Sequence, residues 1–292
     1  MLPDALHLEI ETVLRENTFL HHTITKFTPV GGGCINDAHV VTTDRGSFFV
    51  KYNHARRYPG MFEAEARGLE VLKNAAELSV PEVVGTGQAD DRAFLILDYI
   101  DSRPQEKNFW ENFGRGLARL HKHSNQHFGL EHSNYIGSLP QRNAFRESWT
   151  EFFVNERIRP QLHFSRESGK TDKDLEKKFE RLFARLGEFF PAEPPALLHG
   201  DLWSGNYMTG SHGEAVIIDP AVYFGHRYMD LGMSKLFGGF APEFYRAYHD
   251  EYPLDPNWQQ GIEIANLYPL MVHVNLFGGG YLGSVNSILG GF

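Results

Sequence analysis

The sequence predicts an α+β protein in which a small antiparallel sheet is followed by a mainly helical region. Residues 24–52 and 80–100 consist of short segments rich in β-branched and aromatic residues, separated by Gly and Asp turn signals. From about residue 106 onward, apolar residues recur mainly at helical spacing. Because the pattern changes near residue 100, we predict an N-terminal lobe over residues 1–100 and a C-terminal lobe over residues 101–292.

The N-terminal lobe is expected to begin with an amphipathic helix over residues 4–16, because Leu6, Ile10, Val13 and Leu14 share one face. Three antiparallel strands follow, and a helix over about 61–78 precedes two more strands. The predicted strands are ITKFTPV, AHVVTT, GSFFVKY, VPEVVGTG and AFLILDYI.

The C-terminal lobe is expected to be built from helices with two short β-like interruptions. The helices are predicted near 106–123, 145–167, 172–189, 240–250 and 257–276, and the β-like pieces near 196–199 and 214–219.

Composition excludes several classes of partner. The formal net charge is −9 and there is no long Lys or Arg run, which argues against a nucleic-acid binder. No stretch approaches the 18 or so apolar residues of a membrane span, and the polar start lacks the pattern of a secretory signal. Cys34 is the single cysteine, so no intrachain disulfide forms. We expect a cytoplasmic protein.

The most informative segment is LLHGDLWSGNYMTGSHGEAVIIDPA, residues 197–221. An apolar run ends in Asp201, Asn206 follows five residues later, and a second apolar run delivers Asp219. One carboxylate that accepts a proton and two oxygen ligands for Mg²⁺ are the groups that phosphoryl transfer from ATP requires. The alternative is that Asp201 and Asn206 only form a turn, but the spacing and the following strand favour chemistry.

Candidate nucleotide-binding residues lie in the N-terminal lobe. Gly31, Gly32, Gly33 and Cys34 separate two predicted strands, where backbone N–H groups could approach phosphates, although tight hairpins use the same residues. Lys51 ends a strand and could contact the α- and β-phosphates. Glu65 on the next helix shares the inward face of Leu69 and Leu72 and is the preferred partner of Lys51, with Glu63 as the alternative.

The HGDxxxxN segment followed by a strand ending in Asp resembles the kinase-like phosphotransferase superfamily. The resemblance implies a protein-kinase-like two-lobed fold, with Asp201 as catalytic residue and with Asn206 and Asp219 as metal ligands. It also implies that the backbone of Asp98, Tyr99 and Ile100 holds adenine. Asp219 is followed by Pro-Ala where protein kinases have Phe-Gly, which points to small-molecule kinases.

Further segments resemble the fructosamine kinase, or ketosamine-3-kinase, family over about residues 24–283. They are GGGCIN, MFEAEARGLEVL, FGLEHSNYIGSLPQRN, WTEFFVNERIRPQ and HGDLWSGN. The resemblance implies that ATP and Mg²⁺ are used to phosphorylate the 3-hydroxyl of a ketosamine such as fructosamine or ribulosamine, which initiates deglycation and protein repair. The implied partner is a small ketoamine or a glycated protein, and the chain is expected to be a monomer or a redox-linked homodimer through Cys34.

Several interpretations stay open at this point. Trp203 could stack on a sugar ring or pack in the core. Asn134, Tyr135 and Gln141 could contact the substrate or fasten loops. Rival functions are a kinase of another alcohol (an aminoglycoside, choline or homoserine), a pseudokinase scaffold, and a metal hydrolase, which lacks a convincing ligand cluster.

Overall fold

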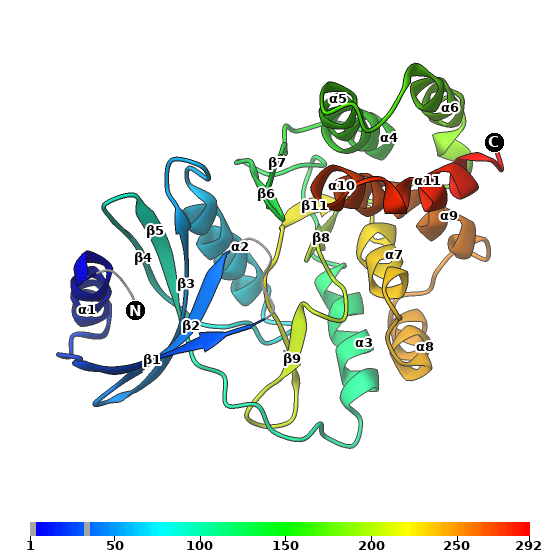
Figure 1. Ribbon diagram of the computed structural model, residues 1–292. Coiled ribbons are helices and arrows are strands. Elements are labelled where there is room, and N and C mark those ends of the chain that lie inside the picture. The colour runs from blue at the N-terminus through cyan, green and yellow to red at the C-terminus, as the bar shows by residue number, and fades with distance from the viewer. Residues whose placement is uncertain (1–3, 32–35) are drawn as a thin grey trace. The chain divides into compact units, whose positions relative to one another are not determined.

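The computed structural model describes residues 4–31 and 36–292, and this part of the chain forms two compact units (Figure 1). The first unit covers the described chain up to Gln105 together with Met208–Ile218. The second unit comprises Glu106–Tyr207 and Asp219–Phe292. Every helix in the described ranges is too short or too polar to cross a membrane.

The first unit is built on a five-stranded antiparallel sheet in the order β1-β2-β3-β5-β4. The strands are β1 (Ile24–Val30), β2 (Asp37–Thr43), β3 (Gly46–His54), β4 (Val83–Ala89) and β5 (Arg92–Asp98). β5 is an interior strand, between β3 and β4. Its apolar residues form a continuous run because side chains on both faces of the sheet are buried.

One helix covers each face of this sheet, as Figure 1 shows. α1 (Asp4–Thr18) packs Leu6, Ile10, Val13 and Leu14 against one face, and α2 (Met61–Ala75) packs against the other. Side chains of a strand alternate between faces. Phe94 and Ile96 of β5 accordingly contact the α1 side, whereas Ala93, Leu95 and Leu97 contact the α2 side.

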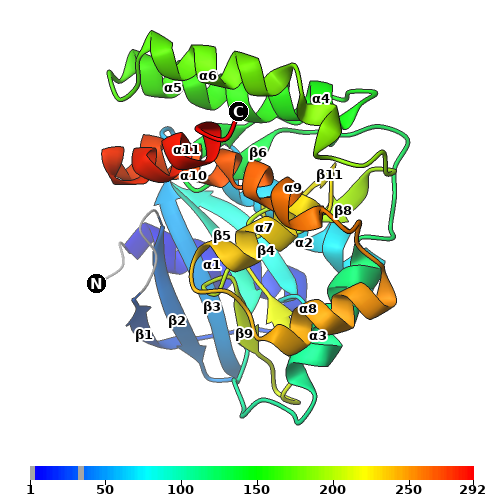
Figure 2. The same ribbon diagram turned by 90° about the vertical axis from the view of Figure 1, so that its right-hand side faces the viewer.

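The second unit is mainly helical. Its helices include α3 (Phe109–Leu120) and α8 (Pro242–Glu251), which lie side by side in Figure 2. The remaining helices are α4 (Trp149–Phe152), a π-helix (Phe153–Ile158), α5 (Arg159–Glu167), α6 (Lys173–Phe183), α7 (Tyr228–Leu236), α9 (Trp258–Ala265), α10 (Leu267–Phe277) and α11 (Leu282–Leu289), with 3-10 turns at Leu186–Glu188 and Gly279–Tyr281.

Short strand pairs carry the polar loops. β8 (Ala196–Leu198) pairs antiparallel with β11 (Tyr223–Gly225), and β6 (Asn134–Ile136) pairs with β7 (Leu139–Gln141). β9 (Tyr207–Thr209) pairs with β10 (Ala215–Ile217). The N–H of Ile217 donates to the carbonyl of Ser79 at 2.9 Å, which attaches this hairpin to the first unit.

The predicted α+β class is confirmed, and so are the N-terminal elements and most of the predicted helices. The prediction for 145–167 is refined, because a π-helix separates α4 from α5. The sequence did not predict α7 or α11, nor the hairpin β6–β7. In α7 all residues from Tyr228 to Ser234 are buried, so it carries no amphipathic stripe that would mark it as a helix.

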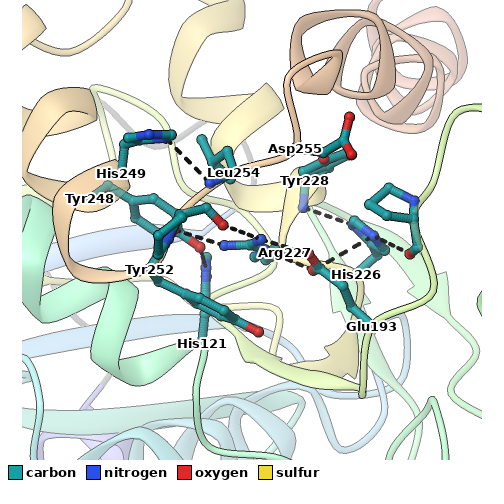
Figure 3. Close-up of polar contacts among 12 residues, drawn as sticks. His121, Glu193, His226, Arg227, Tyr228, Tyr248, His249, Tyr252, Leu254 and Asp255 are labelled. Carbon is teal, nitrogen blue, oxygen red and sulfur yellow. Dashed lines mark hydrogen bonds and ion pairs between the residues drawn. The ribbon is translucent and has the colours of Figure 1, made fainter.

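A polar cluster fixes the chain where it enters α7 (Figure 3). The guanidinium of Arg227 donates to both carboxylate oxygens of Glu193, and also to the carbonyls of Tyr252 and Pro253. The preceding His226 is buried, and its Nε2 lies 3.2 Å from the carbonyl of Pro191. Burial lowers the pKa of His226 to about 3, and the positive charge of Arg227 adds to this effect although the Pro191 contact opposes it.

The buried imidazole predicts acid sensitivity of the fold. The folded protein keeps His226 neutral, whereas the unfolded chain protonates it below about pH 6.5, so stability is lost as the pH falls from 6.5 toward 3. The free energy of unfolding should fall by about 1.4 kcal/mol per pH unit in that window from this group. His226→Gln should be less stable at pH 7.5 and should lose stability less steeply in acid, measured by urea unfolding at several pH values. Parallel acid slopes for the two proteins would contradict the assignment.

Candidate active site

β8 delivers the polar loop that begins at His199. Because His199 is buried, its side chain needs an internal partner. Its Nδ1 atom accepts a hydrogen bond from the backbone N–H of Asp201 at 3.2 Å, which leaves the ring proton on Nε2. His199 thus holds the backbone at Asp201.

Asn206 closes the same loop onto Asp201. Its Nδ2 group donates to the backbone carbonyl of Asp201 at 2.9 Å and to the Oδ2 carboxylate oxygen at 3.0 Å. The amide is therefore oriented with its nitrogen toward Asp201, and Oδ1 is the atom that it can offer to a cation. The sequence placed these two residues five apart, and the structure brings them into direct contact.

The environment of Asp201 disfavours its charged form. Burial raises the pKa of Asp201 to about 7, the hydrogen bond from Asn206 opposes the rise, and the negative charges of Asp219 and Asp230 add to it. A carboxyl group with a pKa near the working pH is suited to accept a proton during a reaction.

Asp230 of α7 anchors the loop that begins at His199. Its carboxylate accepts the N–H of His199 at 2.8 Å and the N–H of Gly200 at 2.9 Å, and it lies 3.2 Å from Nε2 of His121. Burial alone would raise the pKa of Asp230, but the hydrogen bond with His121 and the N–H of Gly200 lower it below its usual range. A charged, fully buried carboxylate thus fixes two consecutive peptide groups next to Asp201.

Asp219 follows β10 at the point where the chain re-enters the second unit. Its backbone is left-handed, with φ of 54°, which is uncommon for a residue other than glycine. The next residues return at once to the catalytic loop, since the N–H of Ala221 donates to the carbonyl of His199 at 2.9 Å and β11 begins at Tyr223. Asp201, Asn206 and Asp219 therefore belong to two segments that are bonded to each other.

Close packing of these two segments requires Gly200. Its φ is +86°, and a Cβ atom at this position would lie 2.0 Å from the carbonyl oxygen of Ala221. Backbone cannot approach backbone this closely if a side chain is present.

A depression opens beside Asp201 in the second unit. Its lining combines apolar side chains with backbone of the catalytic loop: Ile136, Gly200, Asp201, Met229, Met233, Tyr268 and Pro269. Trp203 lies two residues after Asp201, half-buried, with its ring over Gly205 and edge-on to Phe237 at 6.0 Å. Trp203 is thus held in place by packing while part of it stays accessible.

The first unit holds the predicted lysine–glutamate pair. Lys51 is 4% exposed and forms an ion pair with Glu65 of α2. Strand alternation explains the pairing, because Val50 contacts the α1 face and Lys51 therefore points to the α2 face. Glu63 is exposed, so the preference for Glu65 over Glu63 is confirmed.

The remaining predicted nucleotide residues are at the ends of strands. Asp98 ends β5, and its carboxylate accepts the N–H of Glu82 at 2.6 Å, which fixes the start of the segment that continues through Tyr99 and Ile100. Gly31 follows β1 and is exposed. Gly32, Gly33 and Cys34 lie outside the described residues.

Sequence reasoning missed Asp230 and His121. Both lie far along the chain from the HGD segment, within apolar or helical runs that carry no motif of their own. It left Asn134 and Gln141 open between two roles, and the structure buries both side chains against the segment after Asp219.

Comparison with known proteins agrees with this architecture. A crystal structure of a candidate fructosamine-3-kinase from Haemophilus somnus 129PT superposes with a TM-score of 0.89 at 26% identity, covering 98% of this chain and 99% of that one. A ternary complex of an aminoglycoside phosphotransferase with AMP-PNP and hygromycin B superposes with a TM-score of 0.64 at 15% identity over 96% of this chain and 98% of that one, which shows the shared fold.

Sequence relatives are more specific. The chloroplastic protein-ribulosamine 3-kinase of Arabidopsis thaliana is 40% identical over 271 residues, 91% of this chain and 82% of the relative. A candidate ketoamine kinase of Vibrio parahaemolyticus is 38% identical over 277 residues, 94% of each chain.

The fold and the loop around Asp201 define a phosphotransferase of the protein-kinase-like superfamily. The family model for fructosamine kinase matches residues 6–291. The chain belongs to the fructosamine kinase family.

The donor atoms fit a magnesium ion. The Oδ1 atom of Asn206 and the carboxylate of Asp219 are hard oxygen ligands, which Mg²⁺ prefers. Among the described residues there is no group of three or more His, Cys, Asp or Glu side chains arranged to hold a metal by themselves. Such a group is not required, because Mg²⁺ in kinase sites is bound by one or two protein oxygens together with substrate phosphates and water.

The contact between Gly200 and Ala221 predicts a sharp local requirement for glycine. Gly200→Ala should lower turnover at least tenfold and the free energy of unfolding by about 2 kcal/mol, because the methyl group displaces the loop that carries Asp201. Gly187→Ala is the matched control, since its Cβ meets no atom within 4 Å and its φ is not left-handed. Steady-state rates and urea unfolding measure both effects, and equal behaviour of the two variants would refute the packing argument.

Proposed function

We propose that this protein is an ATP-dependent kinase that phosphorylates the 3-hydroxyl of ketosamines such as fructosamine or ribulosamine. The observation that carries the proposal is the contact of Asn206 with Asp201 in a loop anchored on Asp230, in a chain of the fructosamine kinase family. The names of the relatives, ketoamine kinase and protein-ribulosamine 3-kinase, support this acceptor class.

In the proposed mechanism, Asp201 orients the acceptor hydroxyl and takes its proton as the γ-phosphoryl group is transferred in line. Its raised pKa favours this role, because a carboxylate held away from solvent is a stronger base than an exposed one. Asp230 keeps Asp201 in position by bonding the two peptide groups that precede it.

Asn206 and Asp219 would hold Mg²⁺, which supplies charge neutralisation at the phosphates. Lys51 would contact the α- and β-phosphates, and Glu65 would fix the direction of the Lys51 ammonium. The N–H groups of Gly31, Gly32, Gly33 and Cys34 are proposed to approach the phosphates, and the backbone of Asp98, Tyr99 and Ile100 to hold adenine.

The acceptor side of the proposal rests on the depression beside Asp201. The apolar side chains that line it would contact the carbon face of a sugar bound against this surface, and Trp203 would add an aromatic surface for the same purpose. Either a free ketosamine or a glycated protein side chain could present the reacting hydroxyl. We also propose a cytoplasmic location, and a monomer or a disulfide-linked homodimer through Cys34 as the oligomeric state.

Removing the proposed base gives the most direct test. Asp201→Asn should lower the turnover number for a ribulosamine or fructosamine by about 10³-fold, within the range that general bases contribute. ATP affinity, measured by calorimetry, should stay within about threefold of the parent protein. Turnover that survives the substitution would remove Asp201 from the mechanism.

The acceptor class is tested by comparing alcohols at fixed ATP. Ketosamines derived from fructose, ribulose and erythrulose should accept phosphate at least 100-fold more efficiently than an aminoglycoside, choline or homoserine. Faster transfer to one of those alcohols would replace the proposed substrate class. Nucleotide binding without transfer to any acceptor would instead support a scaffold function.

The ion pair of Lys51 predicts a selective effect on the nucleotide. Glu65→Gln should raise KM for ATP about tenfold with a smaller change in KM for the ketosamine, because the buried ammonium loses the carboxylate that orients it. Glu63→Gln changes an exposed residue on the same helix and should leave both constants unchanged. Steady-state kinetics on the two variants make the comparison, and an equal response would contradict the pairing argument.

A further inference from the structure

The backbone of Asp219 is in a conformation that its surroundings must maintain. A non-glycine residue with φ of 54° costs about 1–3 kcal/mol, and the conformation persists only where neighbouring contacts hold it. Asp tolerates this region better than most residues, but tolerance alone does not select one conformation. The contacts of the residues just after Asp219 therefore contribute to holding its backbone in this conformation.

Two buried amide side chains bind those residues. Nδ2 of Asn134 donates to the carbonyl of Val222 at 2.8 Å, and Nε2 of Gln141 donates to the carbonyl of Ala221 at 3.1 Å. Asn134 and Gln141 are directly opposite each other in the hairpin β6–β7, so they present both donors side by side. The hairpin therefore donates hydrogen bonds to the carbonyl groups of two successive residues, Ala221 and Val222.

The amide of Gln141 has a single satisfactory orientation. Its Oε1 atom accepts the hydroxyl of Tyr268 at 2.7 Å, and its Nε2 atom also donates to Oδ1 of Asn134 at 2.8 Å. With both ends engaged and 1% of the residue exposed, rotation of the amide would leave several buried polar atoms unpaired. Gln141 is thus a rigid donor to the chain after Asp219.

Asn143 and Arg157 hold Asn134 in place. Asn143 donates to Oδ1 of Asn134 at 3.0 Å, and the guanidinium of Arg157 donates to Oδ1 of Asn143 at 2.8 Å. Arg157 is fully buried and its guanidinium carbon lies 3.8 Å from the centre of the Tyr223 ring, in the strand that follows Val222. The network therefore contacts the Asp219 segment both directly and through β11.

The opposite edge of the segment is bonded to the catalytic loop through the contact between the Ala221 N–H and the His199 carbonyl. Ala221 thus uses its N–H for the loop of Asp201 and its carbonyl for Gln141. A shift of Gln141 would move the peptide groups beside Asp219 while leaving the anchor of the catalytic loop, Asp230, in place.

We propose that Gln141, supported by Asn134, is a positioning residue that fixes the carboxylate of Asp219 for Mg²⁺. This inference rests on the proposed function, in which Asp219 is a metal ligand. An apolar side chain could fill the same space, but it could not select the direction of the Ala221 carbonyl. The amide is therefore required for metal geometry and not only for packing.

The test compares Gln141→Met with Gln161→Met in the full-length chain. Gln161 is also 1% exposed, and it also accepts a hydrogen bond from a side-chain amide, that of the half-buried Asn275, at 2.8 Å, but it lies on α5. Both variants lose a buried glutamine and should lose stability. Mg²⁺ affinity is measured by titration in the presence of a non-hydrolysable ATP analogue, and hydrogen exchange is followed in the peptide that covers residues 219–223.

Gln141→Met should weaken Mg²⁺ binding about tenfold and speed amide exchange in that peptide, whereas Gln161→Met should change neither. Tyr268→Phe, which removes a single oxygen atom, should weaken Mg²⁺ binding about threefold and serves if Gln141→Met fails to fold. If Gln141→Met folds and its Mg²⁺ affinity is unchanged, the inference is overturned. If Gln141→Met does not fold, an unchanged Mg²⁺ affinity of Tyr268→Phe overturns it. Asp219→Asn distinguishes failure of the proposed metal ligand from failure of the positioning role of Gln141. If Asp219→Asn leaves Mg²⁺ binding intact, Asp219 is not the metal ligand and both claims fail. If Asp219→Asn abolishes Mg²⁺ binding while the test variant binds Mg²⁺ normally, only the positioning role fails.

Discussion

The structure of the loop that ends in Asp201 depends on one buried charge, that of Asp230. The carboxylate of Asp230 accepts two successive backbone N–H groups, those of His199 and Gly200, from the loop that ends in Asp201. Burying a carboxylate is unfavourable unless it is fully hydrogen-bonded, and here backbone donors and His121 supply the bonds. Because these donors belong to the loop itself, the loop cannot move without leaving the charge unpaired. A buried anchor of this kind fixes the backbone at Asp201 more firmly than packing alone.

The negative charge of Asp230 also affects the pKa of Asp201. Asp230 is fully buried and contributes, after burial itself and the charge of Asp219, to the raised pKa of Asp201. One side chain therefore does two things: it holds the backbone that carries Asp201, and it makes that carboxyl group more basic. His121 contacts the Oδ2 atom of Asp230 with its Nε2, and the hydroxyl of Tyr248 lies 2.7 Å from Nδ1 of His121.

The sequence predicted those parts of the site that are contiguous or regularly spaced. Asp201 and Asn206 belong to one loop between apolar runs, and Lys51 and Glu65 follow from the period of a strand and of a helix, so local rules were enough. Asp230 could not be found in this way, since its partners lie about thirty residues earlier in sequence and α7 is buried on all sides. The hairpin β6–β7 was also missed, because strands of three residues give too little alternation to detect.

The ambiguity over Asn134 and Gln141 shows why geometry was needed. A side-chain amide is equally suited to bind a sugar hydroxyl or a backbone carbonyl, since both groups are met by the same donor and acceptor atoms. Sequence therefore cannot separate the two roles. In the structure both amides are buried and bonded to the carbonyls of Ala221 and Val222, so their hydrogen-bonding capacity is used by the protein itself. The hairpin β6–β7 thus contributes Ile136 to the lining of the depression beside Asp201, while its Gln141 is bonded to Tyr268 and to the segment after Asp219.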